Sequence, residues 1–237
     1  MIYCIGSSQV NLFTGVDKIP PEWPLKAYDI LPWFKTFHIG PVTAYQAKKH
    51  FAKVRNILEA NKFNKKKDYF LPVFGSVDMR MHVYKQVVRQ KKPMEAIVNS
   101  IANRYLANIQ LLLFEGYKVI LYGCVGTAVR ARDSDSRPKF GTIKERNEAT
   151  ELFNGRLIDF CTRHDLHYLS VFDEMLLENG KTDLRYMDTD FMGEGNGLHA
   201  TTKMLPLLLW KCRDIGLIPF DTAFLPFESG NYFIKGG

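Results

Sequence analysis

The chain has 237 residues, 46% of them hydrophobic, which is enough to bury one substantial core, and a single domain over residues 1–237 is the expected organisation. Its formal net charge is +7, but eight lysines and arginines lie between Lys48 and Lys67, where the only acid is Glu59. Apolar residues recur among them at helical spacing, which favours the solvated face of an amphipathic helix over a nucleic-acid surface. No stretch approaches the roughly eighteen apolar residues of a membrane-spanning helix, so neither nucleic acid nor a membrane is an expected partner.

Strand patterns and helix patterns alternate along the chain. The expected strands are, in order, 1–6, 37–40, 69–74, 118–122 and 167–172, and the expected helices are 43–61, 94–115, 144–164 and 201–213. Strands separated by helices of this length indicate βαβ units. The sequence therefore predicts an α/β fold, a three-layer α/β/α sandwich around a five-stranded parallel sheet, of the flavodoxin-like kind.

Three segments fit neither pattern. A proline-rich stretch from Pro20 to Trp33 is expected to be a loop packed on the domain, and 130–141 is a polar, charged loop. From about residue 214 the chain ends in an apolar tail that carries five aromatic residues without helical periodicity. We expect this tail to cover its own domain, or alternatively to form a homodimer contact.

The four cysteines have no paired spacing, which supports neither a zinc site nor a disulfide framework. Three of them lie in apolar segments, so we expect buried free thiols in a reducing compartment. The first residues lack the basic region and cleavage site of a secretory signal. These features predict a cytoplasmic protein with no metal.

Residues able to do chemistry follow several of the predicted strands. Ser8 comes after the first strand, Gly40 after the second, Gly75 to Asp78 after the third, and His199 precedes the last helix. The carboxyl ends of parallel strands meet at one edge of a sheet, where open α/β folds bind ligands. A serine hydroxyl is a weak nucleophile until a base such as histidine takes its proton. Ser8 and His199 are thus candidate partners, although a turn serine and a core histidine are the structural alternatives.

Four short blocks in order strengthen this interpretation: Gly6-Ser7-Ser8-Gln9, Ile39 to Tyr45, Phe74 to His82, and Asn196-Gly197-Leu198-His199. Together they resemble the blocks of the SGNH, or GDSL-like, hydrolases, and the third resembles a branch with Gly-Glu-Ile-Asp-Cys-Arg there. The resemblance implies the same α/β/α fold, Ser8 as nucleophile and His199 as general base.

The resemblance also implies roles for the second and third blocks. The backbone N–H groups of Ser8 and Gly40 would stabilise an oxyanion. Val77, Asp78 and Arg80 would belong to the oxyanion or substrate-binding region. Gly40 is alternatively a glycine needed only for its turn, and Asp78 with Arg80 alternatively an ion pair that fixes the local fold.

The chain departs from the family pattern at the residue that supports the histidine. Asn196 stands where the family has aspartate, and an amide orients an imidazole without stabilising the imidazolium by a full charge. Asp188, Asp190 and Glu194 are alternative carboxylates. Ser7 and Gln9 also replace the aspartate and histidine of the first block.

The resemblance implies a serine esterase that needs no cofactor and cleaves a small-molecule or glycan ester, such as an O-acetyl group on a carbohydrate, through an acyl-Ser8 intermediate. Three alternatives remain. Acyl or glycosyl transfer to a carbohydrate would use Pro20–Trp33 as a lid that excludes water. A catalytically impaired binding protein would follow from Asn196. A structural partner in an assembly would use the apolar tail.

Overall fold

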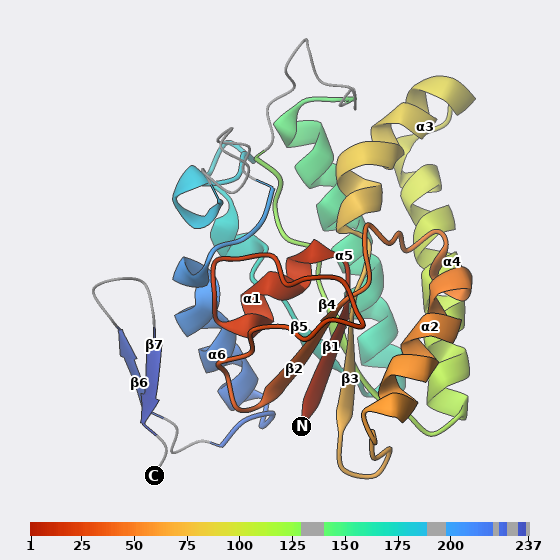
Figure 1. Cartoon of the computed structure of the whole chain (residues 1–237). Helices are drawn as coiled ribbons and strands as arrows, with labels where there is room; N and C mark the ends of the chain where they lie inside the picture. The colour runs from red at the N-terminus through yellow and green to blue at the C-terminus, as the bar shows by residue number, and fades with distance from the viewer. Residues whose placement is uncertain (129–139, 189–197, 220–222, 227–231, 236–237) are drawn as a thin grey trace.

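The computed structural model describes residues 1–128, 140–188, 198–219, 223–226 and 232–235 of the chain. Five parallel strands form the central sheet in the order β2-β1-β3-β4-β5 (Figure 1). Their bounds are Ile2–Gly6 for β1, Phe34–His38 for β2, Tyr69–Val73 for β3, Lys118–Tyr122 for β4 and His167–Leu169 for β5. The predicted five-stranded parallel sheet is confirmed.

Helices lie on both faces of this sheet. The longer helices are α2 (Ala47–Ala60), α4 (Met94–Phe114), α5 (Ile143–His164) and α6 (Leu205–Asp214), and the shorter are α1 (Asn11–Thr14) and α3 (Val83–Gln90). A 3₁₀ turn, Ser8–Val10, leads into α1, a π-helical turn, Asp78–His82, leads into α3, and a 3₁₀ turn, Thr202–Met204, leads into α6. Further 3₁₀ turns span Asp173–Met175 and Leu184–Tyr186.

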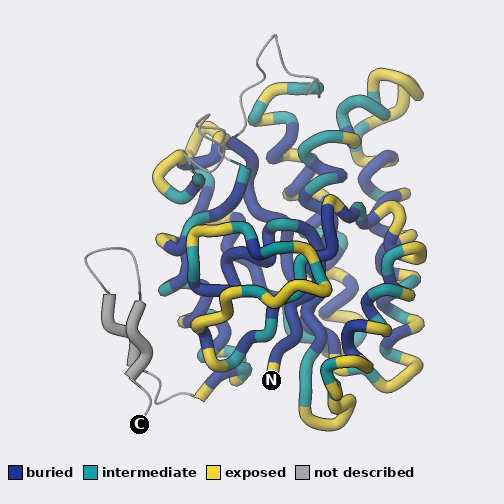
Figure 2. Tube along the Cα trace, in the orientation of Figure 1, coloured by how far each residue is buried: buried dark blue, intermediate teal, exposed yellow. Residues whose placement is uncertain are grey.

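The alternation of side chains along β1 explains the three layers. Tyr3 and Ile5 pack into a core with α2, α4 and α5, whereas Ile2 and Cys4 pack into a second core with α1 and α6. All four side chains are at most 2% exposed, because a strand covered on both faces buries both of its side-chain sets. Figure 2 shows the sheet and the inner faces of the helices as buried. The predicted α/β/α sandwich is therefore confirmed.

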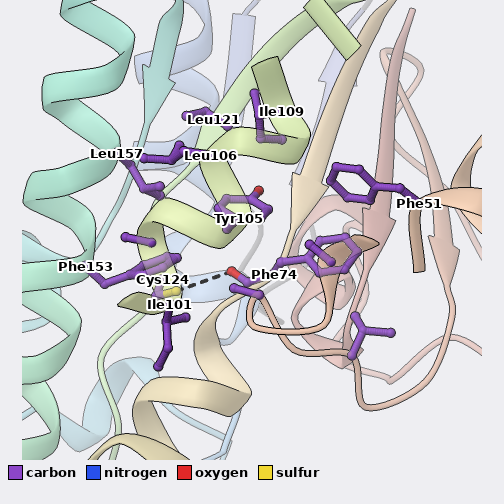
Figure 3. Packing of buried hydrophobic residues seen from close by; sticks show 14 of the residues in the cluster. Phe51, Phe74, Ile101, Tyr105, Leu106, Ile109, Leu121, Cys124, Phe153 and Leu157 are labelled. Atoms are coloured by element: carbon purple, nitrogen blue, oxygen red, sulfur yellow. Dashed lines mark hydrogen bonds between the residues drawn. The ribbon is translucent and has the colours of Figure 1, made fainter. Parts of the chain in front are cut away.

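Aromatic rings fill the larger of the two cores (Figure 3). Tyr105 of α4 lies between Phe74 and Phe153, with ring centroids 6.0 and 6.1 Å away. The Cys124 thiol donates to the Phe74 carbonyl oxygen at 3.4 Å. All four cysteines are free and buried, as the sequence predicted.

Two strands differ from their predicted bounds by more than one residue. The second strand covers 34–38 rather than 37–40, because Gly40 adopts a φ of +93° and turns the chain. The fifth strand ends at Leu169, and the Ser170 hydroxyl then accepts the Phe172 N–H in a turn. The short helical segments 8–14 and 78–90 were not predicted.

The proline-rich segment runs beside the edge strand β2. The Trp23 N–H donates to the His38 carbonyl oxygen at 2.8 Å, and the Asp29 carboxylate accepts both the N–H and the hydroxyl of Thr36. In the tail, β6 (Ala223–Pro226) and β7 (Tyr232–Lys235) form an antiparallel pair. The predicted loop at 130–141 falls mostly outside the described residues. No helix among the described residues is long and apolar enough to cross a membrane.

Candidate active site

Ser8 lies where β1 meets the carboxyl edge of the sheet. β1 ends at Gly6, where a side chain has no room because its Cβ would lie 2.1 Å from the Val73 carbonyl oxygen of β3. Ser7 is extended and buried, and its N–H donates to that same oxygen at 3.0 Å. Ser8 then begins the 3₁₀ turn. This tight exit from the sheet fixes the direction in which the Ser8 hydroxyl leaves the backbone.

His199 is brought to Ser8 across 191 residues of sequence. The distance from Ser8 Oγ to His199 Nε2 is 2.8 Å, and the distance from His199 Nδ1 to Asp188 Oδ2 is also 2.8 Å. A carboxylate only accepts, so Nδ1 carries the proton when His199 is neutral, and Nε2 is left to accept the Ser8 proton. The histidine is 4% exposed. The predicted pairing of Ser8 with His199 therefore exists as a hydrogen bond, and its geometry is that of a nucleophile–base–acid triad.

Asp188 is an acid partner of His199 in the structure. Nδ1 has one hydrogen, and the Asp188 carboxylate accepts it. Asn196, with Asp190 and Glu194, lies outside the described residues, so the role that the resemblance gives to Asn196 stays a prediction. Asp188 was one of the carboxylates that the sequence left open.

Backbone pairing explains why Asp188 reaches His199 from eleven positions away. Met187 and Ala200 form an antiparallel bridge, and the Asp188 N–H donates to the His199 carbonyl oxygen at 2.8 Å. Asp188 Oδ1 in turn accepts the backbone N–H groups of Leu198 and His199, at 2.7 and 2.8 Å. Both oxygens of the Asp188 carboxylate thus accept hydrogen bonds that position His199.

Gly40 follows β2 at the same edge as Ser8. Its φ of +93° is a conformation that favours glycine, and an added Cβ would come within 3.2 Å of the Glu22 carboxylate. Within the described part of the chain, the N–H groups of Ser8 and Gly40 donate to no acceptor. These two donors are therefore free to bind an oxygen atom. Glu22, which sequence reasoning missed, is a charged group beside Gly40.

Val77 and Asp78 follow β3 at this edge. Val77 has no polar side-chain atom, so it cannot supply a side-chain donor to an oxyanion. Asp78 is 1% exposed, and its carboxylate accepts the N–H groups of Ala44 and Tyr45 at 2.6 and 3.3 Å. Burial raises the pKa of Asp78 to about 7, against the lowering effect of these two hydrogen bonds. Asp78 therefore braces the turn that follows Gly40.

Arg80 forms a hydrogen bond with the residue before His199 and does not contact Asp78 as an ion pair. Its guanidinium donates to the Leu198 carbonyl oxygen at 3.2 Å, and no ion pair links Arg80 with Asp78, both of which the structure describes. Burial and the neighbouring Arg146 guanidinium lower the pKa of Arg80 to about 10, and the Asp188 carboxylate opposes this. Arg80 thus supports His199 through the backbone.

Two buried amides complete this support. Gln9 donates to the same Leu198 oxygen at 2.7 Å, and Asn11 donates to the Ala200 oxygen at 3.1 Å. Sequence analysis treated Gln9 only as a departure from the family pattern and did not select Asn11. The available signal was the presence of two amides in the otherwise apolar run that ends at Phe13.

Among the residues that the structure describes, no three His, Cys, Asp or Glu side chains come together in a group that could hold a metal ion.

Comparison with known proteins places the fold. No family model matches the sequence, and a search of curated proteins found no match. Among solved structures, the chain is similar to a candidate acylhydrolase from Bacteroides fragilis, with 14% identity, a TM-score of 0.58, and coverage of 92% of this chain and 88% of that one. A GDSL-like lipase from Bacteroides thetaiotaomicron gives 14% identity, a TM-score of 0.54, and coverage of 89% and 86%. An extracellular lipase from Streptomyces rimosus gives 11% identity and a TM-score of 0.51, with coverage of 89% of this chain and 98% of that one. At these identities the likeness shows a shared fold.

Proposed function

We propose that this protein is a serine esterase with Ser8 as its nucleophile. The observation that carries the proposal is the unbroken pair of 2.8 Å hydrogen bonds that joins Ser8 to His199 and His199 to Asp188. The names of solved structures with the same fold, a lipase and an acylhydrolase, support ester cleavage as the reaction class.

The first half of the reaction forms an acyl-enzyme. His199 Nε2 takes the proton of the Ser8 hydroxyl as Oγ attacks the ester carbonyl carbon. The oxygen that becomes negative lies at the free N–H groups of Ser8 and Gly40, each donor typically contributing about 3 kcal/mol to the transition state. His199 then gives its proton to the leaving alcohol, and the acyl group remains on Ser8.

The second half regenerates the enzyme. His199 takes a proton from water as the water oxygen attacks the acyl carbon, and Ser8 leaves with the proton returned by His199. In both halves the Asp188 carboxylate stabilises the positive imidazolium, and its bonds to the Leu198 and His199 N–H groups keep it facing Nδ1.

The substrate is proposed to be an O-acylated carbohydrate, such as an acetyl ester. The support for this finer assignment is the resemblance of the four sequence blocks to SGNH hydrolases. Acyl transfer to a sugar hydroxyl differs from hydrolysis only in the acceptor, and a transfer product formed in the presence of a polyol would identify it. The alternative of a catalytically impaired protein rested on Asn196, and the Asp188 carboxylate at His199 Nδ1 supports an active enzyme instead.

The experiment that tests the esterase proposal is hydrolysis of p-nitrophenyl acetate by the wild type, Ser8→Ala and Ser7→Ala. Ser7 is the matched control because it is the adjacent hydroxyl, is buried, and makes no side-chain hydrogen bond in the described structure. We expect Ser8→Ala to lose on the order of 10³-fold or more in kcat, and Ser7→Ala to keep the wild-type rate. Equal rates for the wild type and Ser8→Ala would refute the proposal.

A further inference from the structure

A groove lies beside the catalytic edge, between α3 and α4. It has a volume of about 450 Å³, within the range that holds small-molecule ligands. Figure 1 shows α3 and α4 as neighbouring helices, with α2 close to the lower part of α4. Ser8 and His199 do not line this groove, and the mechanism above leaves it unused.

One wall of the groove is a polar stripe that repeats every four residues. It runs along the π-helical turn and α3, through Asp78, His82, Gln86 and Gln90. Residues four apart share one helix face, so these side chains line the same side of the groove. The Gln90 amide nitrogen donates to Gln86 Oε1 at 3.0 Å, which leaves the Gln86 amide hydrogens and the Gln90 oxygen for a ligand.

The other walls combine hydroxyl groups with small apolar surfaces. Thr43 and Tyr45 come from the segment before α2, and Ser100, Ile97 and Ile101 come from α4. Tyr45 is 49% exposed, so its ring is accessible to a ligand. Its ring is covered on one side by the Arg104 guanidinium, 4.2 Å from the ring centroid.

The lining has a chemistry that selects among ligand classes. Amides and hydroxyls both donate and accept, as do the hydroxyl groups of a sugar. Phosphate and carboxylate ligands are typically bound by arginine clusters, and the lining of the groove holds no arginine and one lysine, Lys92. The exposed Tyr45 ring offers apolar surface to the C–H face of a sugar ring.

We propose that this groove is a binding site for a neutral, hydroxyl-rich carbohydrate segment. This proposal rests on the esterase proposal, because it takes the carbohydrate bound in the groove to be part of the ester substrate. Gly40 beside Ser8 and Thr43 in the groove are three residues apart, and Val77 and Asp78 are adjacent, so the two sites share their border. A glycan held in the groove extends towards Ser8, where its ester group is cleaved.

Binding is tested with the Ser8→Ala protein, which cannot turn over an ester, on an array of neutral and acidic oligosaccharides. We expect retention of neutral glycans, and an affinity reduced about tenfold by adding Gln86→Leu, which removes the free amide donor. Arg89→Leu is the matched control, because Arg89 is exposed on the same helix and does not line the groove. No glycan retained, a preference for acidic glycans, or unchanged binding by the Gln86 variant would each overturn the proposal.

A kinetic measurement then separates this proposal from the esterase proposal. For an O-acetyl ester of a glycan retained on the array, Gln86→Leu in the otherwise wild-type protein should raise KM about tenfold, while its rate on p-nitrophenyl acetate stays unchanged. An unchanged KM for the glycan ester would refute the link between groove and Ser8. Glycan binding by Ser8→Ala together with an inactive wild type would refute only the esterase proposal.

Discussion

Replacement of Asp188 by asparagine tests how the acid controls the histidine. Asp188 accepts three hydrogen bonds of 2.7 to 2.8 Å, two from backbone N–H groups through Oδ1 and one from His199 through Oδ2. An asparagine oxygen can keep the two backbone bonds, but its amide nitrogen then faces Nδ1 as a donor. His199 must accept there and carry its proton on Nε2, where it can no longer take the Ser8 proton.

The expected cost is large because the wrong tautomer removes the general base. The same change in a serine-protease triad lowers kcat by about 10⁴-fold, which corresponds to roughly 5.4 kcal/mol of transition-state stabilisation. We expect Asp188→Asn to show a loss of this order on p-nitrophenyl acetate. The thermal unfolding midpoint should change little, because the backbone bonds to Leu198 and His199 remain.

Asn196→Asp is the matched counterpart of this variant. Since Asp188 already accepts the single Nδ1 hydrogen, a new carboxylate at 196 should leave kcat within about threefold of the wild type. A loss of less than about tenfold for Asp188→Asn, or a gain of about tenfold for Asn196→Asp, would refute the assignment of Asp188 as the acid.

Three further variants test the rest of the site. Gly40→Ala puts a Cβ into a left-handed conformation 3.2 Å from the Glu22 carboxylate, and displacing the Gly40 N–H should lower kcat about 10²-fold; an unchanged kcat would exclude this donor from the oxyanion site. Gln9→Leu removes the 2.7 Å bond to the Leu198 carbonyl and should lower kcat about tenfold with KM unchanged, which steady-state kinetics would measure; a change confined to KM would contradict a positioning role. Because burial raises the pKa of Asp78 to about 7, its folded form holds a proton that its unfolded form has lost, so its contribution to stability is complete below about pH 4 and is lost as pH rises through about 7. Urea unfolding should therefore show the wild type losing at least about 1 kcal/mol relative to Asp78→Asn between pH 4.5 and 7.5, and parallel pH profiles would contradict this.

The layered fold was predictable because its signals are local. Strands such as 69–73 and 118–122 are short apolar runs, and the long helices between them carry their own stop signals, such as Gly116 after α4. The basic residues of 47–60 fall on the solvent side, while Phe51, Val54 and Ile57 are buried. Such patterns predict the fold well because the apolar face that is visible in the sequence is the face that packs against the core.

The site was predictable where a residue follows a strand end, as Ser8 and Gly40 do, or lies in one of the four sequence blocks, as His199 does. Ser8 and Gly40 come directly after β1 and β2, so the topology alone puts them at one edge. Asp188 belongs to no such position, and its place opposite His199 depends on the antiparallel bridge between Met187 and Ala200. Spacing within the motif pointed to Asn196, because a three-residue interval is visible in sequence, whereas the bridge that places Asp188 is not.

The buried supports of His199 were missed for a related reason. Gln9 is a polar residue whose partner is a backbone carbonyl about 190 positions away, and nothing in its neighbours specifies that partner. The groove between α3 and α4 was not predicted either. Because the helical segment 78–90 was missed, the polar residues that repeat there every four positions could not be assigned to one helix face.

The central claim, that Ser8 is an activated nucleophile, is tested most directly by covalent labelling with an organophosphonate ester reagent, followed by peptide mass spectrometry. The wild type should gain one phosphonyl group, and fragmentation should place it on Ser8 rather than Ser7. Ser7→Ala should label like the wild type, Ser8→Ala should not label, and Asp188→Asn should label far more slowly because His199 no longer accepts the proton. Labelling at another residue, or a wild type that remains unmodified at reagent concentrations that label a known serine esterase, would contradict the account.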